Sequence, residues 1–351
     1  MVADEEPFAH YIAEYGRQPG TFAVSPTLRQ KSYEEVVGME LMERDGIRIS
    51  KMTLGTVQLG MNYGIANRSG MPDESGARLI LAEAERGGIV SFDTAQDYGR
   101  SEAVLGRCLA GRSGLAIISK FTLKADGPLS RAELERMVAE KAEASLRRLG
   151  VSKIPILMLH HAGDLLKFGE PLVEACRNLV RSGYAAKMGV SFGADPPHTA
   201  NAIWACARDD LFEAVQVPVN VLDHRLLRSG LLEEMGKAGK IVFARSVFLQ
   251  GLLFLAEEEL PEKLKPAAEW IGRVRRAATR EGMSPAELAV AFVRDLPQVH
   301  SLVIGAETAE QVRANIALLN APPLTERTRA ELASAMSDVP EIIISPHLWH
   351  R

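Results

Sequence analysis

Four polar side chains suited to acid–base chemistry lie at the ends of three apolar, strand-like segments, or just beyond them. They are Asp93, Tyr98, Lys120 and His160. Parallel strands present their carboxyl ends at one rim, which is where eight-stranded α/β barrel enzymes carry their active sites. A phenol has a pKa of about 10 and is a weak acid, and a neighbouring lysine ammonium would lower that pKa. A carboxylate could hold the ammonium charged, and an imidazole could orient a reacting oxygen.

Strand-like and helix-like segments alternate through most of the chain. The strand-like segments are residues 52–57, 89–92, 116–121, 154–159, 186–190, 214–217, 241–244 and 302–304. The helix-like segments are residues 74–86, 102–109, 131–149, 172–181, 199–208, 231–238, 267–281, 285–296 and 309–319. This alternation predicts βαβ units with parallel strands. Because no G-x-G-x-x-G fingerprint accompanies the eight strands, we expect the α/β class and a closed (β/α)8 TIM barrel.

The chain is expected to divide into residues 1–38 and residues 39–351. The first segment contains three prolines that interrupt any long element, and we interpret it as an N-terminal extension. The second should form a single barrel domain that begins with a β-hairpin. The pair Asp45-Gly46 suits a two-residue hairpin turn, because both residues can take positive φ.

The composition is that of an ordinary globular protein. Of the 351 residues, 46% are hydrophobic and 25% are charged, with a net charge of −4. This balance gives no support to a nucleic-acid or membrane partner. Cys108, Cys176 and Cys206 lack metal or disulfide spacing and predict a reducing compartment. We see neither a signal peptide nor an apolar run of membrane length, so we expect a cytoplasmic protein.

At its polar motifs the chain resembles the aldo-keto reductase family. The matching motifs are Leu54-Gly55-Thr56, the segment from Asp93 to Tyr98, Lys120, Leu159-His160, Gly189-Val190-Ser191, Gln216, and Ile304-Gly305 with Gln311 and Asn315. They occur in the family's order and cover nearly the whole chain. The resemblance implies a barrel plugged by the hairpin, a nicotinamide dinucleotide bound without a Rossmann domain, and reduction of carbonyls.

The resemblance also implies roles for the polar residues. Tyr98 would be the general acid and Lys120 its electrostatic partner. Asp93 would anchor that lysine, and His160 would orient the carbonyl oxygen. Acid–base assistance of this kind typically contributes about 10²–10⁴-fold in rate. His161 would contact the substrate, at a position where many members carry an aromatic residue.

The cofactor groove is assigned by the same resemblance. The expected contacts are Gly55, Thr56, Val57, Asp93, Ser191, Gln216, Arg245, Ser246, Gln250, Gly305, Gln311 and Asn315. Ser191 and Gln216 would bind the carboxamide, and Arg245 would stand where an aromatic residue usually presses on the nicotinamide. Ser246 and Gln250 would donate to the pyrophosphate from the loop after the seventh strand.

The adenosine end fits the family pattern less well. Gln311 and Asn315, one helical turn apart, would bind the adenine edge. Glu307 stands where Lys or Arg often follows the eighth strand, and Arg313 is the cation nearby. An acidic residue there could accept from a ribose hydroxyl, as in NAD sites. On the family's usual preference we expect NADP(H) rather than NAD(H).

Other hypotheses stay open at this point. The adjacent His160 and His161 could suggest a metal, but neighbours on a strand point to opposite faces, so we expect no metal site. The expected partner is a small-molecule carbonyl substrate, sugar-like by analogy with a bacterial branch of the family. One alternative is a nucleotide-binding regulatory protein of the same fold, like the β subunits of potassium channels. Another is an aldolase or isomerase that uses Lys120 as a Schiff base. The oligomeric state is not indicated.

Overall fold

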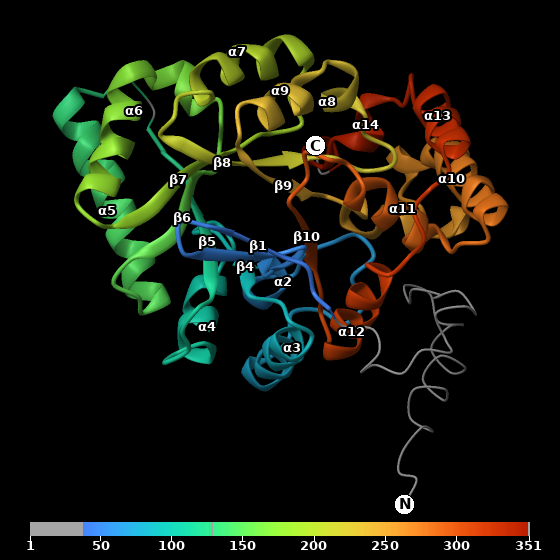
Figure 1. Cartoon of the computed structure of the whole chain (residues 1–351), viewed down its shortest axis with the longest axis horizontal. Helices are drawn as coiled ribbons and strands as arrows, with labels where there is room; N and C mark the ends of the chain where they lie inside the picture. Colours follow the sequence, from blue (N-terminus) through green and yellow to red (C-terminus); the bar gives the residue numbers. More distant parts are fainter. Residues whose placement is uncertain (1–37, 126, 128, 350–351) are drawn as a thin grey trace, which may run out of the picture.

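Eight parallel strands close into a barrel in the computed structural model, which describes residues 38–125, 127 and 129–349. The strands are β3 (Met52–Gly55), β4 (Ser91–Asp93), β5 (Ala116–Phe121), β6 (Ile154–Leu159), β7 (Ala185–Ser191), β8 (Phe212–Pro218), β9 (Ile241–Arg245) and β10 (Ser301–Gly305). They follow one another in chain order around the barrel, and β10 closes it by pairing with β3. Figure 1 shows the helices arranged around these strands. The expected α/β class and TIM-barrel architecture are confirmed.

A two-stranded hairpin precedes the barrel. β1 (Leu41–Arg44) and β2 (Ile47–Ser50) pair in antiparallel fashion. Between them Asp45 and Gly46 have φ angles of 51° and 77°, as a tight two-residue turn requires. Ile49 on β2 is fully buried in the apolar cluster that fills the barrel interior. The expected hairpin is therefore present and plugs the barrel.

The helices outside the barrel match the segments expected from the sequence. They are α3 (Glu74–Arg86), α4 (Ser101–Cys108), α5 (Arg131–Leu149), α6 (Asp164–Arg181), α7 (Pro197–Ala207), α9 (Leu231–Lys237), α10 (Ala267–Glu281), α11 (Pro285–Arg294) and α12 (Ala309–Leu318). In α5 the Ser130 side chain and Glu133 form a capping box, and Gly150 ends the helix with a φ of 67°. Such caps are local signals, which is why its bounds could be predicted from sequence.

Three details differ from the sequence-based expectation. Val57 does not extend β3 but begins the short helix α2 (Val57–Gly60). Helix α6 begins at Asp164 rather than at residue 172, because its first part lies before a kink at Gly169. Two C-terminal helices are not expected from the sequence, namely α13 (Glu326–Ala335) and α14 (Glu341–Ile344). The N-terminal extension falls almost wholly outside the described residues.

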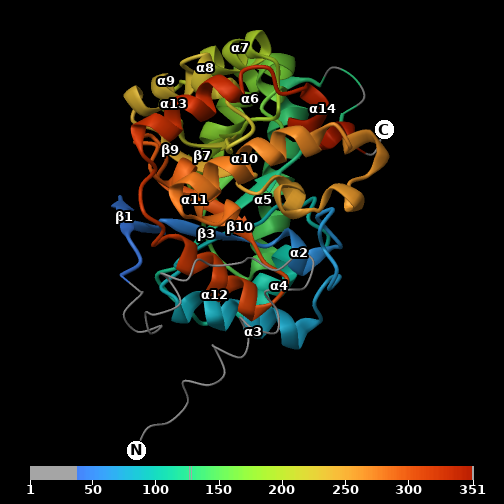
Figure 2. The ribbon, with the colours of Figure 1, turned by 90° about the vertical axis from the view of Figure 1, so that its right-hand side faces the viewer.

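The connection between β9 and β10 adds a second helical layer on one side of the barrel. α11 packs on β10, α10 on α11, and α13 on α10, as can be followed in Figure 2. Beyond α13 the chain is tied back to the barrel by Arg225, which donates to Ala194 O (3.0 Å) and Ile344 O (3.2 Å). None of the helices in the described part of the chain combines the length and apolar character needed to span a bilayer.

Candidate active site

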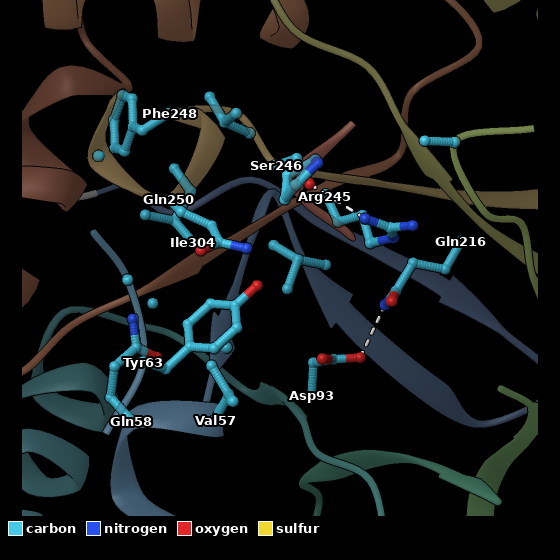
Figure 3. Close-up of a pocket in the computed structure, with 18 of the residues that line it drawn as sticks. Val57, Gln58, Tyr63, Asp93, Gln216, Arg245, Ser246, Phe248, Gln250 and Ile304 are labelled. Carbon is cyan, nitrogen blue, oxygen red and sulfur yellow. Dashed lines mark hydrogen bonds between the residues drawn. The ribbon is translucent and has the colours of Figure 1, made fainter. Parts of the chain in front are cut away.

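A cavity of about 670 Å³ lies at the carboxyl ends of the barrel strands. Figure 3 shows side chains from β4, β8, β9 and β10 pointing into it. The lining includes most of the residues selected from the sequence: Gly55, Thr56, Val57, Asp93, Tyr98, His160, His161, Ser191, Gln216, Arg245, Ser246, Gln250, Gly305 and Gln311. Lys120 and Asn315 are fully buried next to lining residues and do not line the cavity themselves. The structure thus brings the selected residues together around one space.

Lys120 and Asp93 form a buried ion pair at the floor of this cavity. Lys120 Nζ lies 2.7 Å from Asp93 Oδ1 and donates to Thr94 O at 2.9 Å. The lysine is fully buried, and Asp93 is 3% exposed. Burial lowers the pKa of Lys120, whereas the charge of Asp93 and its hydrogen bond raise it. The carboxylate is therefore the group that supports the charged ammonium.

Tyr98 faces the cavity beside this ion pair. Lys120 Nζ lies 4.9 Å from the centroid of the Tyr98 ring. Burial raises the pKa of the Tyr98 phenol, the charge of Asp93 raises it further, and Arg245 lowers it. The expectation that Lys120 lowers this pKa is therefore wrong for the free protein, because Asp93 compensates the ammonium and desolvation of the phenolate dominates. The phenol is protonated at neutral pH, as a proton donor must be.

Close packing determines where Tyr98 stands. Ser101 N donates to Tyr98 O at 3.0 Å, and Thr56 Oγ1 donates to Asp93 O at 2.8 Å. At Gly60 a Cβ atom would overlap with the Tyr98 carbonyl oxygen, so only glycine lets α2 approach this turn. The turn that carries the phenol is thus held by backbone contacts on both sides.

His160 follows β6 and stands next to Tyr98. Their rings meet edge to face, with centroids 5.6 Å apart, and His160 Nδ1 lies 3.5 Å from Asp97 Oδ2. Burial first, and then the charges of Lys120 and His161, lower the pKa of His160 to about 3, although Asp97 raises it. His160 is therefore neutral at physiological pH, with one ring nitrogen as donor and the other as acceptor.

His161 lines the cavity, and its ring does not point away from that of His160. The two imidazoles stack, with centroids 5.3 Å apart and 10° between their planes. Because β6 ends at Leu159, the pair lies in a loop, and the side-chain alternation expected for a strand does not hold. Over the described ranges, no group of three or more His, Cys, Asp or Glu side chains could hold a metal ion.

Ser191 and Gln216 end β7 and lie near the end of β8. Gln216 Nε2 donates to Asp93 Oδ1 at 2.7 Å, a bond drawn in Figure 3. Asp93 therefore accepts from both Lys120 and Gln216 through one oxygen. Nothing else in the described chain hydrogen-bonds to the Gln216 amide, so its carbonyl oxygen can serve a ligand in the cavity.

Arg245 ends β9, and its guanidinium is held beside the cavity by uncharged partners. It donates to Phe192 O at 2.8 Å and to Ser246 Oγ at 3.1 Å. Neither contact neutralises the charge. That charge lowers the pKa of Tyr98 and of His160. Arg245, rather than Lys120, is therefore the cation whose field acts on the phenol.

Two loops meet over the cavity. The loop after β9 holds three non-glycine residues with positive φ, which are Ser246 (63°), Leu249 (48°) and Gln250 (55°). Backbone strain of this kind clusters at functional sites. Gly251 in the same loop approaches Ala66 so closely that a Cβ atom would overlap with it. The segment after α2 and the loop after β9 thus form a bridge over the groove.

Some cavity residues are absent from the selection made on the sequence. Tyr63 places a second phenol in the cavity (Figure 3), and burial raises its pKa. The others include Gln58, Phe248, Phe254, Glu341 and His347. Gln58 follows the Gly55-Thr56 motif closely enough to have been included. The two C-terminal residues could not be found in this way, because no local pattern signals that the chain returns to the barrel.

Three buried polar atoms at the cavity wall have no hydrogen-bond partner among the described residues. They are Gln58 Oε1, His160 Nδ1 and Asn315 Oδ1. Buried polar atoms are rarely left unpaired in folded proteins. Asn315 lies behind the wall, with its Nδ2 donating to Gly305 O at 3.3 Å. A long ligand with polar groups along its length, such as a dinucleotide, fits this arrangement.

The chain matches known proteins along most of its length. The model of the Aldo/keto reductase family matches residues 51–336. An uncharacterised oxidoreductase of Mycobacterium tuberculosis is 28% identical over 302 residues, which cover 80% of this chain and 87% of that protein. The L-glyceraldehyde 3-phosphate reductase of Escherichia coli is 24% identical over 331 residues, covering 84% and 91%. Aldo-keto reductase AKR11C1 from Bacillus halodurans, in its holo form, shares the fold with a TM-score of 0.65 at 22% identity, covering 85% of this chain and 96% of that one. The chain therefore belongs to the aldo/keto reductase family of oxidoreductases.

Proposed function

We propose that the protein reduces an aldehyde or a ketone to an alcohol, with NAD(P)H as the reductant and Tyr98 as the proton donor. The observation that carries this proposal is a phenol, protonated at neutral pH, that faces the cavity against the buried pair Asp93–Lys120. Membership of the family adds support, because aldo-keto reductases use nicotinamide cofactors.

The protein's own groups would bind and orient the reactants. The cofactor, when bound, supplies the hydride that goes to the carbonyl carbon. The carbonyl oxygen takes its proton from the Tyr98 hydroxyl, and neutral His160 donates a second hydrogen bond that orients it. The Ser191 hydroxyl and the carbonyl oxygen of Gln216 suit a carboxamide, which offers both a donor and an acceptor.

Two cations would assist this step in different ways. Loss of the proton leaves negative charge on Tyr98, and the uncompensated charge of Arg245 stabilises it. Such stabilisation is stronger in a buried site than in water. Lys120 is paired with Asp93 and contributes mainly through its position against the ring. The positive charge of Arg245 also favours a neutral, reduced nicotinamide over an oxidised one, which agrees with reduction as the direction.

The substrate is proposed to be a small, polar, sugar-like carbonyl compound. His161, Tyr63, Glu341 and His347 add hydrogen-bonding groups to the cavity. The relative from Escherichia coli is named a reductase of L-glyceraldehyde 3-phosphate, which is a polar aldehyde. In this proposal residues 39–351 act as one catalytic domain.

The rate of reduction is expected to stay level across neutral pH. His160 gains a proton only as the pH falls towards about 3, and Tyr98 loses its proton only above the usual phenol pKa, since burial raises it. Both groups therefore keep the required form between about pH 5 and 9. Measurement of kcat/KM over this window at constant ionic strength checks this. A limb near the ordinary histidine pKa that disappears in His160→Gln would contradict it.

A carbonyl screen tests the proposed function. Consumption of NADH and NADPH is followed by absorbance with a panel of aldehydes, ketones and ketoses. Turnover of at least one polar carbonyl is expected. Tight nucleotide binding without turnover of any carbonyl would contradict the proposal and favour a regulatory protein of the same fold. Borohydride trapping of a substrate on Lys120 without nucleotide would favour an aldolase.

A further inference from the structure

We propose that this chain binds NAD(H) in preference to NADP(H), and that Glu307 makes the distinction. The inference rests on the proposed nicotinamide function and reverses the preference expected from the family resemblance. The two dinucleotides differ only in a phosphate on the 2′ oxygen of the adenosine ribose. The residues that discriminate between them must therefore line the end of the groove farthest from the reacting carbonyl.

The far end of the groove can be located from the structure. Tyr98 and Asp93 mark the catalytic end, and Figure 3 shows Gln58 on the opposite side of Tyr63 from Asp93. Gly305 lies next to Gln58, since a Cβ atom built on it would come within 2.5 Å of the Gln58 amide. An extended dinucleotide whose nicotinamide meets Tyr98 must then place its adenosine near the end of β10 and the start of α12.

Glu307 is the charged side chain at that end. It follows β10 and lines the cavity while half-buried. Gln311 holds it from two sides: Glu307 N donates to Gln311 Oε1 at 2.7 Å, and Gln311 Nε2 donates to Glu307 Oε2 at 3.2 Å. The second carboxylate oxygen, Oε1, has no partner in the described part of the chain. A ribose hydroxyl can donate to that oxygen, whereas a 2′-phosphate only accepts.

No cation at this end offsets the charge of Glu307. Among the described residues, the basic side chains that line the cavity are Arg245, His160, His161 and His347. Arg245 and the histidine pair belong to the catalytic end, and His347 comes from the C-terminal segment. Arg313 on α12 is paired with Glu310 at 2.9 Å and lies 3.9 Å from Glu83. Burial raises the pKa of Glu307, and only the hydrogen bond from Gln311 opposes it.

The start of α12 does not supply a phosphate site either. A helix amino terminus can bind a phosphate when its N–H groups are free. Here Thr308 Oγ1 accepts from Gln311 N at 3.2 Å, and Gln311 Oε1 accepts from Glu307 N. The first turn also carries the acidic Glu310. These donors are already satisfied, and the local charge is negative, so a phosphate dianion meets repulsion without compensation.

Binding titrations test this inference without any carbonyl substrate. Dissociation constants are measured by fluorescence for NADH and NADPH, and by calorimetry for ADP-ribose and its 2′-phosphate. We expect the unphosphorylated member of each pair to bind at least about tenfold more tightly, a modest penalty for like charges in contact. Glu307→Gln should reduce this ratio about fivefold or more, and Glu307→Arg should reverse it.

Glu310→Gln is the matched control. It removes one negative charge from the same helix at a position that does not line the cavity, so it should leave the ratio unchanged. Equal or tighter binding of NADPH by the natural protein would overturn the inference, and so would an unchanged ratio in Glu307→Gln. Preferred binding of NADH without turnover of any carbonyl would refute the proposed function and leave this inference standing. Failure of both dinucleotides to bind would refute both.

Discussion

Replacement of Tyr98 by phenylalanine is expected to remove carbonyl reduction and to leave dinucleotide binding in place. The value of kcat/KM should fall by about 10²–10⁴-fold, the usual contribution of a positioned acid. The aromatic ring stays, and with it the edge contact to His160 and the contact to Lys120. The dissociation constant of the preferred dinucleotide should therefore change by less than about threefold. Initial rates and fluorescence titration of one preparation measure both quantities.

Tyr184→Phe is the matched control for that substitution. Its hydroxyl donates to Glu143 at 3.1 Å, away from the cavity, so its loss should not alter the rate. A Tyr98→Phe protein that reduces carbonyls as fast as the natural one would refute the assignment of the acid. A Tyr63→Phe protein that alone lost reduction would transfer the role to the second phenol of the cavity.

Much of the fold could be predicted because its signals are local. The turn at Asp45-Gly46 and the cap at Ser130 each depend on a few neighbouring residues, and both are present. The strands carry apolar runs that end in polar residues, and closure of the barrel brings those ends to one rim. Asp93 and His160, which follow different strands, therefore line the same cavity, as their place in the sequence predicted.

What could not be predicted depends on distances between segments far apart in the chain. The pKa of Tyr98 reflects burial and the opposed charges of Asp93 and Arg245, and sequence gives no measure of any of these. The bond between Gln216 and Asp93 joins residues of two strands on opposite sides of the cavity floor. The stacked imidazoles of His160 and His161 arise because a strand ends one residue earlier than the alternation argument assumed.

Replacement of Lys120 by methionine is expected to destabilise the fold and to abolish reduction together. It would leave the carboxylate of Asp93 buried, with Gln216 as its remaining side-chain donor. An unpaired buried charge costs about 3–5 kcal/mol, and urea denaturation should show a loss of that size in the free energy of unfolding. Lys187→Met is the control. Its partner Asp45 is 71% exposed, so the loss there should be less than about 1 kcal/mol, with the rate unchanged.

Addition of Asp93→Asn to Lys120→Met separates the structural role of the lysine from its catalytic one. The double variant buries no charge, and the new amide oxygen can still accept from Gln216, so most of the lost stability should return. Reduction should not return, because no ammonium then stands against the Tyr98 ring. Recovery of both properties would show that Lys120 only neutralises Asp93. If Lys120→Met alone cost as little as Lys187→Met, the ion pair would not be desolvated, and the electrostatic account of the cavity floor would fail.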